Sequence, residues 1–348
     1  MFTIANRPIG PGNPPYIVAE MSGNHNGDKA RSLEIIRAIA KAGADAVKIQ
    51  TYTADTITLD HDSPEFRISN GGLWDGRTLH DLYHEAHTPW EWHREMFDCA
   101  RENGLAMFSA PFDPTAVDFL ESLDCPAYKI ASFEIVDLPL IRKTAATGKP
   151  LIISTGMADM NEIREAVSAA RDAGNEEIVV LHCVSGYPTP ASESNLGTIA
   201  HLSRELGVQI GLSDHTLGTA VPVAAVALGA TLIEKHVTLR RADGGPDAAF
   251  SLEPDELAEM VRDCRAAVEA LGVAGFQRKP SEEQNAIFRR SLYVVADIAA
   301  GEVVTDRHVR SIRPGYGLEP KHLDRVIGAR AAQDLKRGTA LRWDMIIT

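Results

Sequence analysis

Two histidines occupy matching places in the sequence, each close behind a short apolar run. His215 follows residues 209–212, and His236 follows residues 231–235. If these runs are neighbouring strands, the two imidazoles converge on one point. Two imidazoles together with water suit a divalent cation of borderline hardness, Mn²⁺ first, with Mg²⁺ or Co²⁺ as alternatives. The competing interpretation is that each histidine only hydrogen-bonds a loop.

Two acidic residues stand beside these histidines. Asp214 and Glu234 are expected to point away along their strands and to support the histidines from behind.

A second set of residues has the chemistry of an anion site. The chain is acidic overall, so a phosphorylated substrate needs a local cationic pocket. Lysines, hydroxyls and the backbone N–H groups of a helix that starts after Gly156 would supply one. The side chains of this set are Lys48, Lys129, Ser132, Ser154 and Ser213. Two alternatives stay open: Lys129 or Lys235 as a Schiff-base nucleophile, as in class I aldolases, or a lysine that only pairs with a carboxylate of the next strand.

These residues follow the ends of eight short apolar runs that alternate with helical patterns. Continuous apolar strands that alternate with helices predict parallel pairing, and eight such units predict a (β/α)8 TIM barrel of class α/β. A doubly wound open sheet is the weaker alternative, because SGNHNG stands where a GxGxxG motif would follow the first strand. The predicted strands are residues 16–20, 46–50, 106–109, 127–130, 151–154, 178–182, 209–212 and 231–235.

Catalytic groups of such barrels collect at the C-terminal ends of the strands. The predicted ends carry further polar or aromatic side chains, which a purely structural barrel would not need: Glu20, Gln50, Ser109, Phe112, Glu134 and Tyr187. One connection, residues 51–88, is far longer than usual and is interpreted as a lid over the site, with a solvated insertion as the alternative.

The pattern changes after residue 271. We expect the barrel to cover residues 1–272, a linker residues 273–290, and a small all-β domain residues 291–348. The predicted strands of that domain are residues 291–296, 301–305, 309–313 and 339–346.

Composition limits the function. The chain has 348 residues, 44% of them hydrophobic, and a formal net charge of −13, which disfavours a nucleic-acid partner. The apolar run at residues 221–230 is too short to cross a bilayer. The four cysteines form no CxxC pair, and no signal peptide is recognised, so we expect a cytoplasmic protein.

The motifs together resemble those of the sialic acid synthase family, also called the NeuB-like family. The resemblance runs in order over nearly the whole chain and includes Asn24-His25-Asn26-Gly27, Lys48-Ile49-Gln50-Thr51, Tyr128-Lys129-Ile130-Ala131-Ser132, Ser213-Asp214-His215-Thr216, Glu234-Lys235-His236, Gly245-Pro246-Asp247 and Arg313-Pro314-Gly315. The long connection around Trp74 is similar to that of the pseudaminic acid synthase branch. The C-terminal part resembles the antifreeze-like SAF domain, of the β-clip type, that follows the barrel in this family.

This resemblance implies a reaction. A synthase of this kind condenses phosphoenolpyruvate with an acetamido-sugar, here the open-chain aldehyde of 2,4-diacetamido-2,4,6-trideoxy-L-altrose, and releases phosphate. It implies that His215 and His236 bind the metal, that Glu20 and Glu134 are catalytic, and that Asp247 and Arg313 bind substrate, with Arg313 reaching a second subunit's site in a homodimer. The other substrate-binding residues that the resemblance implies are Lys48, Gln50, Ser109, Phe112, Lys129, Ser132, Ser154, Tyr187 and Ser213.

Other classes remain open at this point. An N-acetylneuraminic or legionaminic acid synthase would share the metal and phosphate residues, although Arg240 and Ala248 depart from the neuraminate pattern. A Schiff-base aldolase or a non-catalytic polysaccharide-assembly protein would need neither metal nor phosphate release.

Overall fold

The computed structural model describes residues 2–69 and 71–347. The chain divides into two compact units, one ending at Gly272 and the other beginning at Val273. Each unit is described by itself below.

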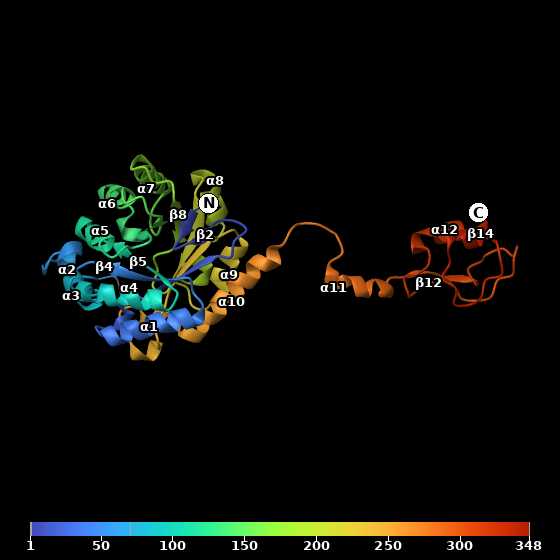
Figure 1. The fold of residues 1–348 in the computed structure, drawn as a ribbon, viewed down its shortest axis with the longest axis horizontal. Coiled ribbons are helices and arrows are strands. Elements are labelled where there is room, and N and C mark those ends of the chain that lie inside the picture. The colour runs from blue at the N-terminus through green and yellow to red at the C-terminus, as the bar shows by residue number, and fades with distance from the viewer. Residues whose placement is uncertain (1, 70, 348) are drawn as a thin grey trace. The chain divides into compact units, whose positions relative to one another are not determined.

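A closed parallel barrel forms the N-terminal unit. Within the described residues its eight strands pair in sequence order, and the last strand pairs with the first (Figure 1). Nearly every strand residue is buried, as expected for strands covered on both faces. The strands are β3 (Tyr16–Glu20), β4 (Ala46–Thr51), β5 (Ala106–Pro111), β6 (Tyr128–Ile130), β7 (Leu151–Ser154), β8 (Ile178–Cys183), β9 (Gln209–Asp214) and β10 (Leu232–His236). The (β/α)8 prediction is therefore confirmed.

Helices cover the outside of the barrel. They are α1 (Lys29–Ala42), α4 (His93–Glu102), α5 (Pro114–Glu121), α6 (Leu138–Ala145), α7 (Met160–Asp172), α8 (Thr198–Leu206), α9 (Ala220–Ala227) and α10 (Pro254–Leu271). Helix α1 illustrates how the local sequence sets the two ends of a helix and its buried face. Asp28 caps its first turn by accepting from the backbone N–H of Ala30, and Gly43 ends it at a φ of 86°. Its Ile35, Ile36 and Ile39 pack into the barrel core.

A short hairpin precedes the barrel, and sequence reasoning missed it. Strands β1 (Phe2–Ile4) and β2 (Arg7–Ile9) are joined by Ala5 and Asn6, both with positive φ. Ile4 and Ile9 are fully buried in the core of the barrel unit. The hairpin therefore adds apolar cover to that core.

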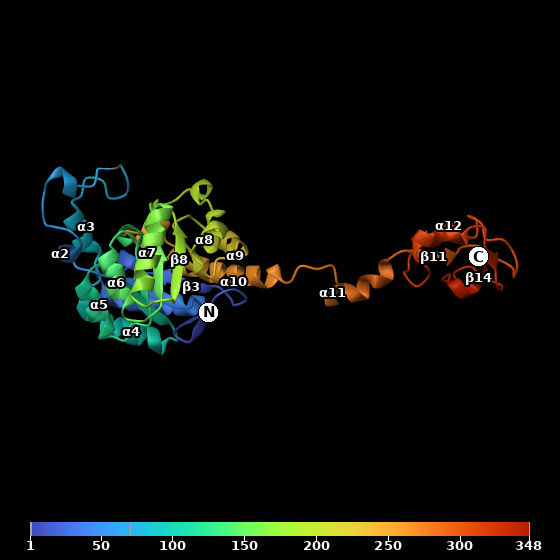
Figure 2. The same ribbon diagram turned by 90° about the horizontal axis from the view of Figure 1, so that it is seen from above.

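The long connection after β4 is partly helical. It contains α2 (Ala54–Ile57) and α3 (Leu79–Ala86), which pack against each other, as both ribbon views show (Figure 2). Neither helix was predicted. We call residues 52–69 and 71–88 the lid segment, because side chains from it line the cavity described below.

The C-terminal unit is smaller and differs in detail from the prediction. Its strands form two-stranded antiparallel pairs, β11 (Ser291–Val294) with β12 (Val309–Ile312) and β13 (Arg330–Ala331) with β14 (Ile346–Ile347). Residues 301–305 and most of 339–346 are not strands, because only isolated bridges such as Val303 to Arg330 form there.

Short helices also occur in this unit. Helix α12 (Leu323–Val326) lies within the region predicted to be all-β, and α11 (Pro280–Glu283) lies within the predicted linker. A separate apolar core, with Leu292, Val304, Val326 and Leu341 at its centre, holds the unit together.

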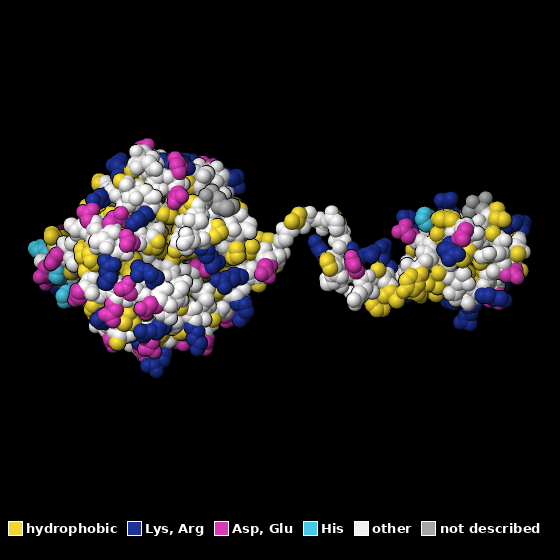
Figure 3. Space-filling model, viewed as in Figure 1, with side chains coloured by type: hydrophobic (Ala, Val, Ile, Leu, Met, Phe, Trp, Pro, Cys, Tyr) yellow, Lys and Arg dark blue, Asp and Glu magenta, His cyan; other side chains and the backbone are white. Residues whose placement is uncertain are grey.

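The surface of the barrel unit is polar and mixed in charge. Lysine, arginine, aspartate and glutamate side chains alternate over the face seen in Figure 3. In the part of the chain that the structure describes, no helix combines the length and the apolar character needed to cross a membrane.

Candidate active site

A cavity of about 430 Å³ opens at the C-terminal ends of the barrel strands. Side chains from the strand ends and from the lid segment line it together. They include many residues proposed from sequence as well as several that were not: Ser22, Gln50, Tyr52, Ile57, Ile68, Trp74, Leu79, Leu82, Tyr83, Phe112, Ser132, Phe133, Glu134, Tyr187, His236 and Asp247. A volume of this size accommodates a sugar-sized ligand.

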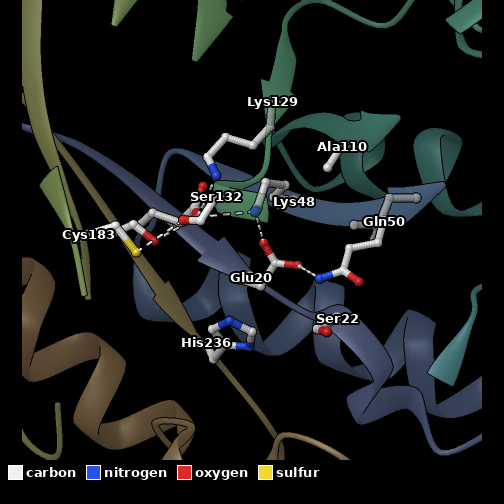
Figure 4. Close-up of polar contacts among 12 residues, drawn as sticks. Glu20, Ser22, Lys48, Gln50, Ala110, Lys129, Ser132, Cys183 and His236 are labelled. Atoms are coloured by element: carbon white, nitrogen blue, oxygen red, sulfur yellow. Dashed lines mark hydrogen bonds and ion pairs between the residues drawn. The ribbon is translucent and has the colours of Figure 1, made fainter. Parts of the chain in front are cut away.

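A cluster of buried charges lies next to the cavity. Lys48 forms an ion pair with Glu20 and a second one with Glu234, at 3.1 Å from Nζ to Oε1. Lys129 faces the same Glu234 oxygen at 3.5 Å. Figure 4 shows the side chains of Glu20 on β3, Lys48 on β4 and Lys129 on β6 pointing toward one another. The predicted cationic pocket is thus already occupied by two carboxylates, so its charges are balanced rather than purely positive.

Glu234 corrects one expectation. It does not point away from the site but lies at the centre of the charged cluster, where it also accepts from the Ser213 hydroxyl at 3.2 Å. The reason is the two-residue period of a strand, which puts Glu234 on the same face as His236. Burial raises the pKa of this carboxyl, but Lys129 and Lys48 outweigh burial and hold it well below its usual value.

Asp214 and Lys235 lie on the opposite face of their strands. Lys235 is fully buried and pairs with Asp214, and its Nζ also donates to the backbone oxygen of Thr216. Asp214 accepts from the backbone N–H and the hydroxyl of Thr216. The ion pair between Lys235 and Asp214 links the ends of β9 and β10 beside the two histidines. Because its ammonium is shielded and paired, Lys235 is not placed to attack a substrate.

The two histidines predicted to bind a metal lie together. The ring centroids of His215 and His236 are 5.4 Å apart. Nδ1 of His215 lies 3.0 Å from the Val184 carbonyl, so this nitrogen carries the proton and Nε2 keeps its lone pair. Nδ1 of His236 is buried and has no hydrogen-bond partner among the described residues.

Asp247 closes the cavity on the same side. Its Oδ2 lies 3.9 Å from Nδ1 of His236 and accepts from the Ser22 hydroxyl. Burial raises the pKa of Asp247. Gly245 sets the turn before it, since a Cβ at its φ of +121° would collide with the Asn26 side chain.

The predicted hydroxyls gather around Gly156. The Gly156 N–H donates to the Ser132 hydroxyl at 3.1 Å, and a Cβ on Gly156 would lie 2.7 Å from that oxygen. The Ser154 and Ser185 hydroxyls are buried without a hydrogen-bond partner among the described residues. A buried hydroxyl without a protein partner can hydrogen-bond a bound ligand.

The helix start expected after Gly156 does not contribute as predicted. Helix α7 begins only at Met160, and Asp159 and Glu162 already satisfy its first N–H groups in a capping box. The N–H group of Gly156 itself is the backbone donor beside these hydroxyls.

The pKa values of Glu134 and Lys48 are displaced toward neutrality. Burial raises the pKa of Glu134 to about 7, against the opposing effect of Lys129. Burial lowers the pKa of Lys48 to about 7, although Glu234 opposes this shift. Both groups therefore change charge near neutral pH, which is a property of acid–base residues.

One predicted substrate-binding residue of the barrel, Ser109, faces away from the site. Ser109 bonds the Thr51 hydroxyl at 2.6 Å and the Ile49 carbonyl, on the outer side of β5. Ala110 takes the inward position instead, as Figure 4 shows. Ser109 is therefore withdrawn from the substrate-binding set. Arg313 is exposed on the C-terminal unit, directly after β12.

Sequence reasoning missed Ser22 and Tyr52, and it named Trp74 only as part of the long connection interpreted as a lid. Ser22 could have been found from strand periodicity, since it lies two residues after Glu20. Tyr52 packs edge-on against Phe112, with centroids 5.1 Å apart, and Trp74 donates from Nε1 to the Pro246 oxygen at 3.1 Å. Their places depend on long-range contacts that no local pattern reveals.

Comparison with known proteins gives a consistent family. The NeuB family profile matches residues 35–275, and the SAF domain profile matches residues 289–347. The pseudaminic acid synthase of Helicobacter pylori is 45% identical, over 96% of this chain and 98% of its own length. The synthase of the same name from Campylobacter jejuni is 44% identical over 94% of this chain and 95% of its own length. The N,N'-diacetyllegionaminic acid synthase of Legionella pneumophila is 34% identical over 98% of this chain and 97% of its own length.

Solved structures agree. The N-acetylneuraminic acid synthetase of Leptospira borgpetersenii matches with a TM-score of 0.73 at 31% identity, covering 82% of this chain and 94% of the other. A 3-deoxy-D-arabino-heptulosonate 7-phosphate synthase from Thermotoga maritima, at 14% identity and a TM-score of 0.61 over 78% of this chain and 93% of the other, shares the fold alone. On the profile match and these relatives, the chain belongs to the NeuB family of sugar-acid synthases, with a SAF domain after its barrel.

Proposed function

We propose that the protein is a pseudaminic acid synthase, a transferase that forms a carbon–carbon bond. It condenses phosphoenolpyruvate with open-chain 2,4-diacetamido-2,4,6-trideoxy-L-altrose and water, giving pseudaminic acid and phosphate. The observation that carries this proposal is the convergence of two imidazoles, two ammonium groups and buried carboxylates beside one sugar-sized cavity. Support for the sugar comes from the relatives of that name at 43–45% identity.

The two histidines fit a divalent cation. Nδ1 of His236 is an orphaned buried nitrogen, and the Val184 carbonyl fixes the tautomer of His215. In the described residues no group of three or more histidine, cysteine or acidic side chains is placed to hold a metal, so water and substrate would complete the coordination. A cation held there, Mn²⁺ in our proposal with Mg²⁺ or Co²⁺ as alternatives, would polarise the aldehyde oxygen as a Lewis acid.

The charged cluster would hold phosphoenolpyruvate. Lys48 and Lys129 supply ammonium groups for its phosphate and carboxylate, and the hydroxyls of Ser132, Ser154 and Ser213 supply hydrogen bonds. The orphaned Ser154 hydroxyl supports this assignment, because a buried donor without a partner gains most from an incoming anion.

Polar groups lining or next to the cavity would hold the sugar. Glu20, Gln50, Tyr187 and Asp247 would bind its hydroxyls and amides, and Phe112 would pack on its carbon chain. Binding both substrates side by side converts an encounter of two molecules into a reaction within one complex.

The bonds then change as follows. C3 of phosphoenolpyruvate attacks C1 of the aldehyde, and water adds to C2 of the enol donor. The water oxygen becomes the C2 carbonyl oxygen, and its two protons account for the new hydroxyl and for the hydrogen phosphate released. Phosphate leaves by cleavage of its bond to C2. Glu134, with a pKa near neutrality, would deliver the proton to the new hydroxyl oxygen, with Glu20 as the other candidate.

The C-terminal domain has a place in this proposal. In the proposed homodimer, Arg313 of one subunit would complete the active site of the other. We also propose that the enzyme acts in the cytoplasm.

The proposal is tested by phosphate release from phosphoenolpyruvate with a panel of acetamido-sugars, with and without EDTA. We expect turnover with the 2,4-diacetamido-2,4,6-trideoxy-altrose substrate, its loss in EDTA, and its return on adding Mn²⁺. Preference for N-acetylmannosamine, or for the substrate of legionaminic acid synthases, would replace the proposed sugar. Full activity in EDTA, or borohydride trapping of pyruvate on Lys129, would overturn the mechanism.

A further inference from the structure

In the part of the chain that the structure describes, the lid segment contributes aliphatic and aromatic side chains to the cavity but no charged ones. Its first residue, Tyr52, lines the cavity together with Ile57, Ile68, Trp74, Leu79, Leu82, Tyr83 and Ala86. The strand ends and the loops after them contribute every charged or amide side chain, with Ser22, Gln50, Glu134, His236 and Asp247, and also aromatic ones such as Phe112 and Tyr187. The side of the cavity formed by the lid segment therefore lacks charged side chains, whereas the strand-end side is mixed. We call the residues Ile57, Ile68, Leu79 and Leu82 the aliphatic wall.

The aliphatic wall is held in place by its own anchors. On one side, Trp74 donates to the Pro246 oxygen at 3.1 Å, and its ring lies 5.7 Å from that of Tyr187. On the other, the Tyr83 ring packs edge-on against Tyr52 at 5.7 Å. A wall anchored at both sides presents a fixed surface to a bound sugar, so its chemistry can discriminate between sugars.

We infer that the aliphatic wall selects sugars whose far end is deoxygenated and acylated. This inference rests on the proposed function, because that function puts the aldehyde carbon beside His236. The polar groups of the strand ends then surround the reacting end of the sugar. The methyl groups at the far end of the molecule, at C6 and on the C4 acetamido substituent, lie against Ile57, Ile68, Leu79 and Leu82.

The discrimination follows from the cost of burying a hydroxyl. A hydroxyl at C6 would lose its water against carbon atoms and find no hydrogen-bond partner in the aliphatic wall. An apolar pocket rejects an added hydroxyl by about 10- to 100-fold. The wall therefore disfavours hexoses with a free C6 hydroxyl relative to 6-deoxy sugars.

The test measures binding of unreactive sugars, so that it does not depend on turnover. The probes are the reduced open-chain alditols of 2,4-diacetamido-2,4,6-trideoxy-altrose and of its 6-hydroxy analogue. Their dissociation constants are measured by titration calorimetry on the full-length protein. We expect the wild type to prefer the 6-deoxy alditol by about 10- to 100-fold.

Two double variants decide whether the wall causes the preference. Ile57→Thr with Ile68→Thr adds hydroxyls, and Ile57→Val with Ile68→Val removes the same volume without adding them. Both isoleucines are only partly buried, so we expect the fold to tolerate either change. Should the threonine double variant unfold, each single threonine variant is measured against its valine counterpart. We expect the threonine variant to reduce the preference at least threefold and the valine variant to keep it.

The outcomes separate the two proposals. The inference is wrong if the wild type binds both alditols equally, if the threonine variant keeps the wild-type preference, or if valine reduces it as much as threonine. The proposed function is judged independently, by phosphate release from the wild type with the unreduced sugar. If the protein prefers the 6-deoxy alditol but releases no phosphate, the inference about the aliphatic wall stands and the proposed function is wrong.

Discussion

At the scale of single residues, the site depends on charges removed from water. Lys48 and Lys129 share Glu234, and Lys48 also pairs with Glu20. Loss of one partner would leave a buried charge uncompensated, which costs several kcal/mol. The cluster is therefore an arrangement in which anionic substrates and protein carboxylates compete for the same ammonium groups.

Glu134 gives the sharpest residue-scale prediction. Burial raises its folded pKa to about 7 from an ordinary value near 4.5. The stability that the protonated Glu134 carboxyl contributes is therefore fully present below about pH 4.5 and is lost as the pH rises through about 7. Glu134→Gln removes the ionisation, so its free energy of unfolding relative to wild type should rise by up to about 3 kcal/mol between pH 4 and pH 8.

Urea unfolding of both proteins at several pH values measures this difference. A constant difference across the range would contradict the raised pKa. In the same variant kcat should fall by about 100-fold or more if Glu134 transfers the proton. An unchanged kcat would move that role to Glu20.

At the scale of elements, the turn after β7 determines how closely hydroxyls approach the substrate. A Cβ at Gly156 would lie 2.7 Å from the Ser132 hydroxyl oxygen and closer still to that of Ser185. Gly156→Ala should therefore displace both hydroxyls and raise the KM for phosphoenolpyruvate about tenfold or more, because each lost hydrogen bond to a charged group costs about 1.5–3 kcal/mol.

Gly197→Ala is the matched control. No atom lies within 4 Å of a Cβ built on Gly197, and neither glycine has a positive φ. Steady-state kinetics should show Gly197→Ala near wild type. Equal KM values for the two variants would mean that the turn after β7 does not shape the substrate site.

At the scale of the whole molecule, the proposed role of the SAF domain is tested by mixing subunits. His236→Ala and Arg313→Ala should each be inactive alone. If Arg313 completes the site of a second subunit, a mixed dimer contains one site with both residues intact, and activity returns on mixing after partial denaturation and refolding. If Arg313 acts in its own subunit, no mixed dimer has a complete site. Phosphate release measures this difference, and continued inactivity despite mixed-dimer formation would contradict the shared site.

Much of the barrel could be predicted from sequence because its signals are local. Runs such as Leu151–Ser154 are continuously apolar, and each is followed by a helical pattern, so strand order and the positions of strand ends follow directly. The matched pair His215 and His236 was placed together for the same reason, and the rings do lie 5.4 Å apart. Sequence alone thus determined the fold and the end of the barrel where the site lies.

Only the tertiary structure decided which side chains face inward and what covers them. The alternation of side chains along a strand allows either set of alternate residues to face inward. In the closed barrel Glu234 faces inward rather than Lys235, and Ala110 rather than Ser109. The lid segment has no strong period of its own, so its wall of Ile57, Ile68, Leu79 and Leu82 emerges only where contacts such as Trp74 to Pro246 fold it over the cavity. Contacts between residues far apart in the chain carry no local pattern, and this is why the charge balance of the site and its apolar side could be learned only from the folded molecule.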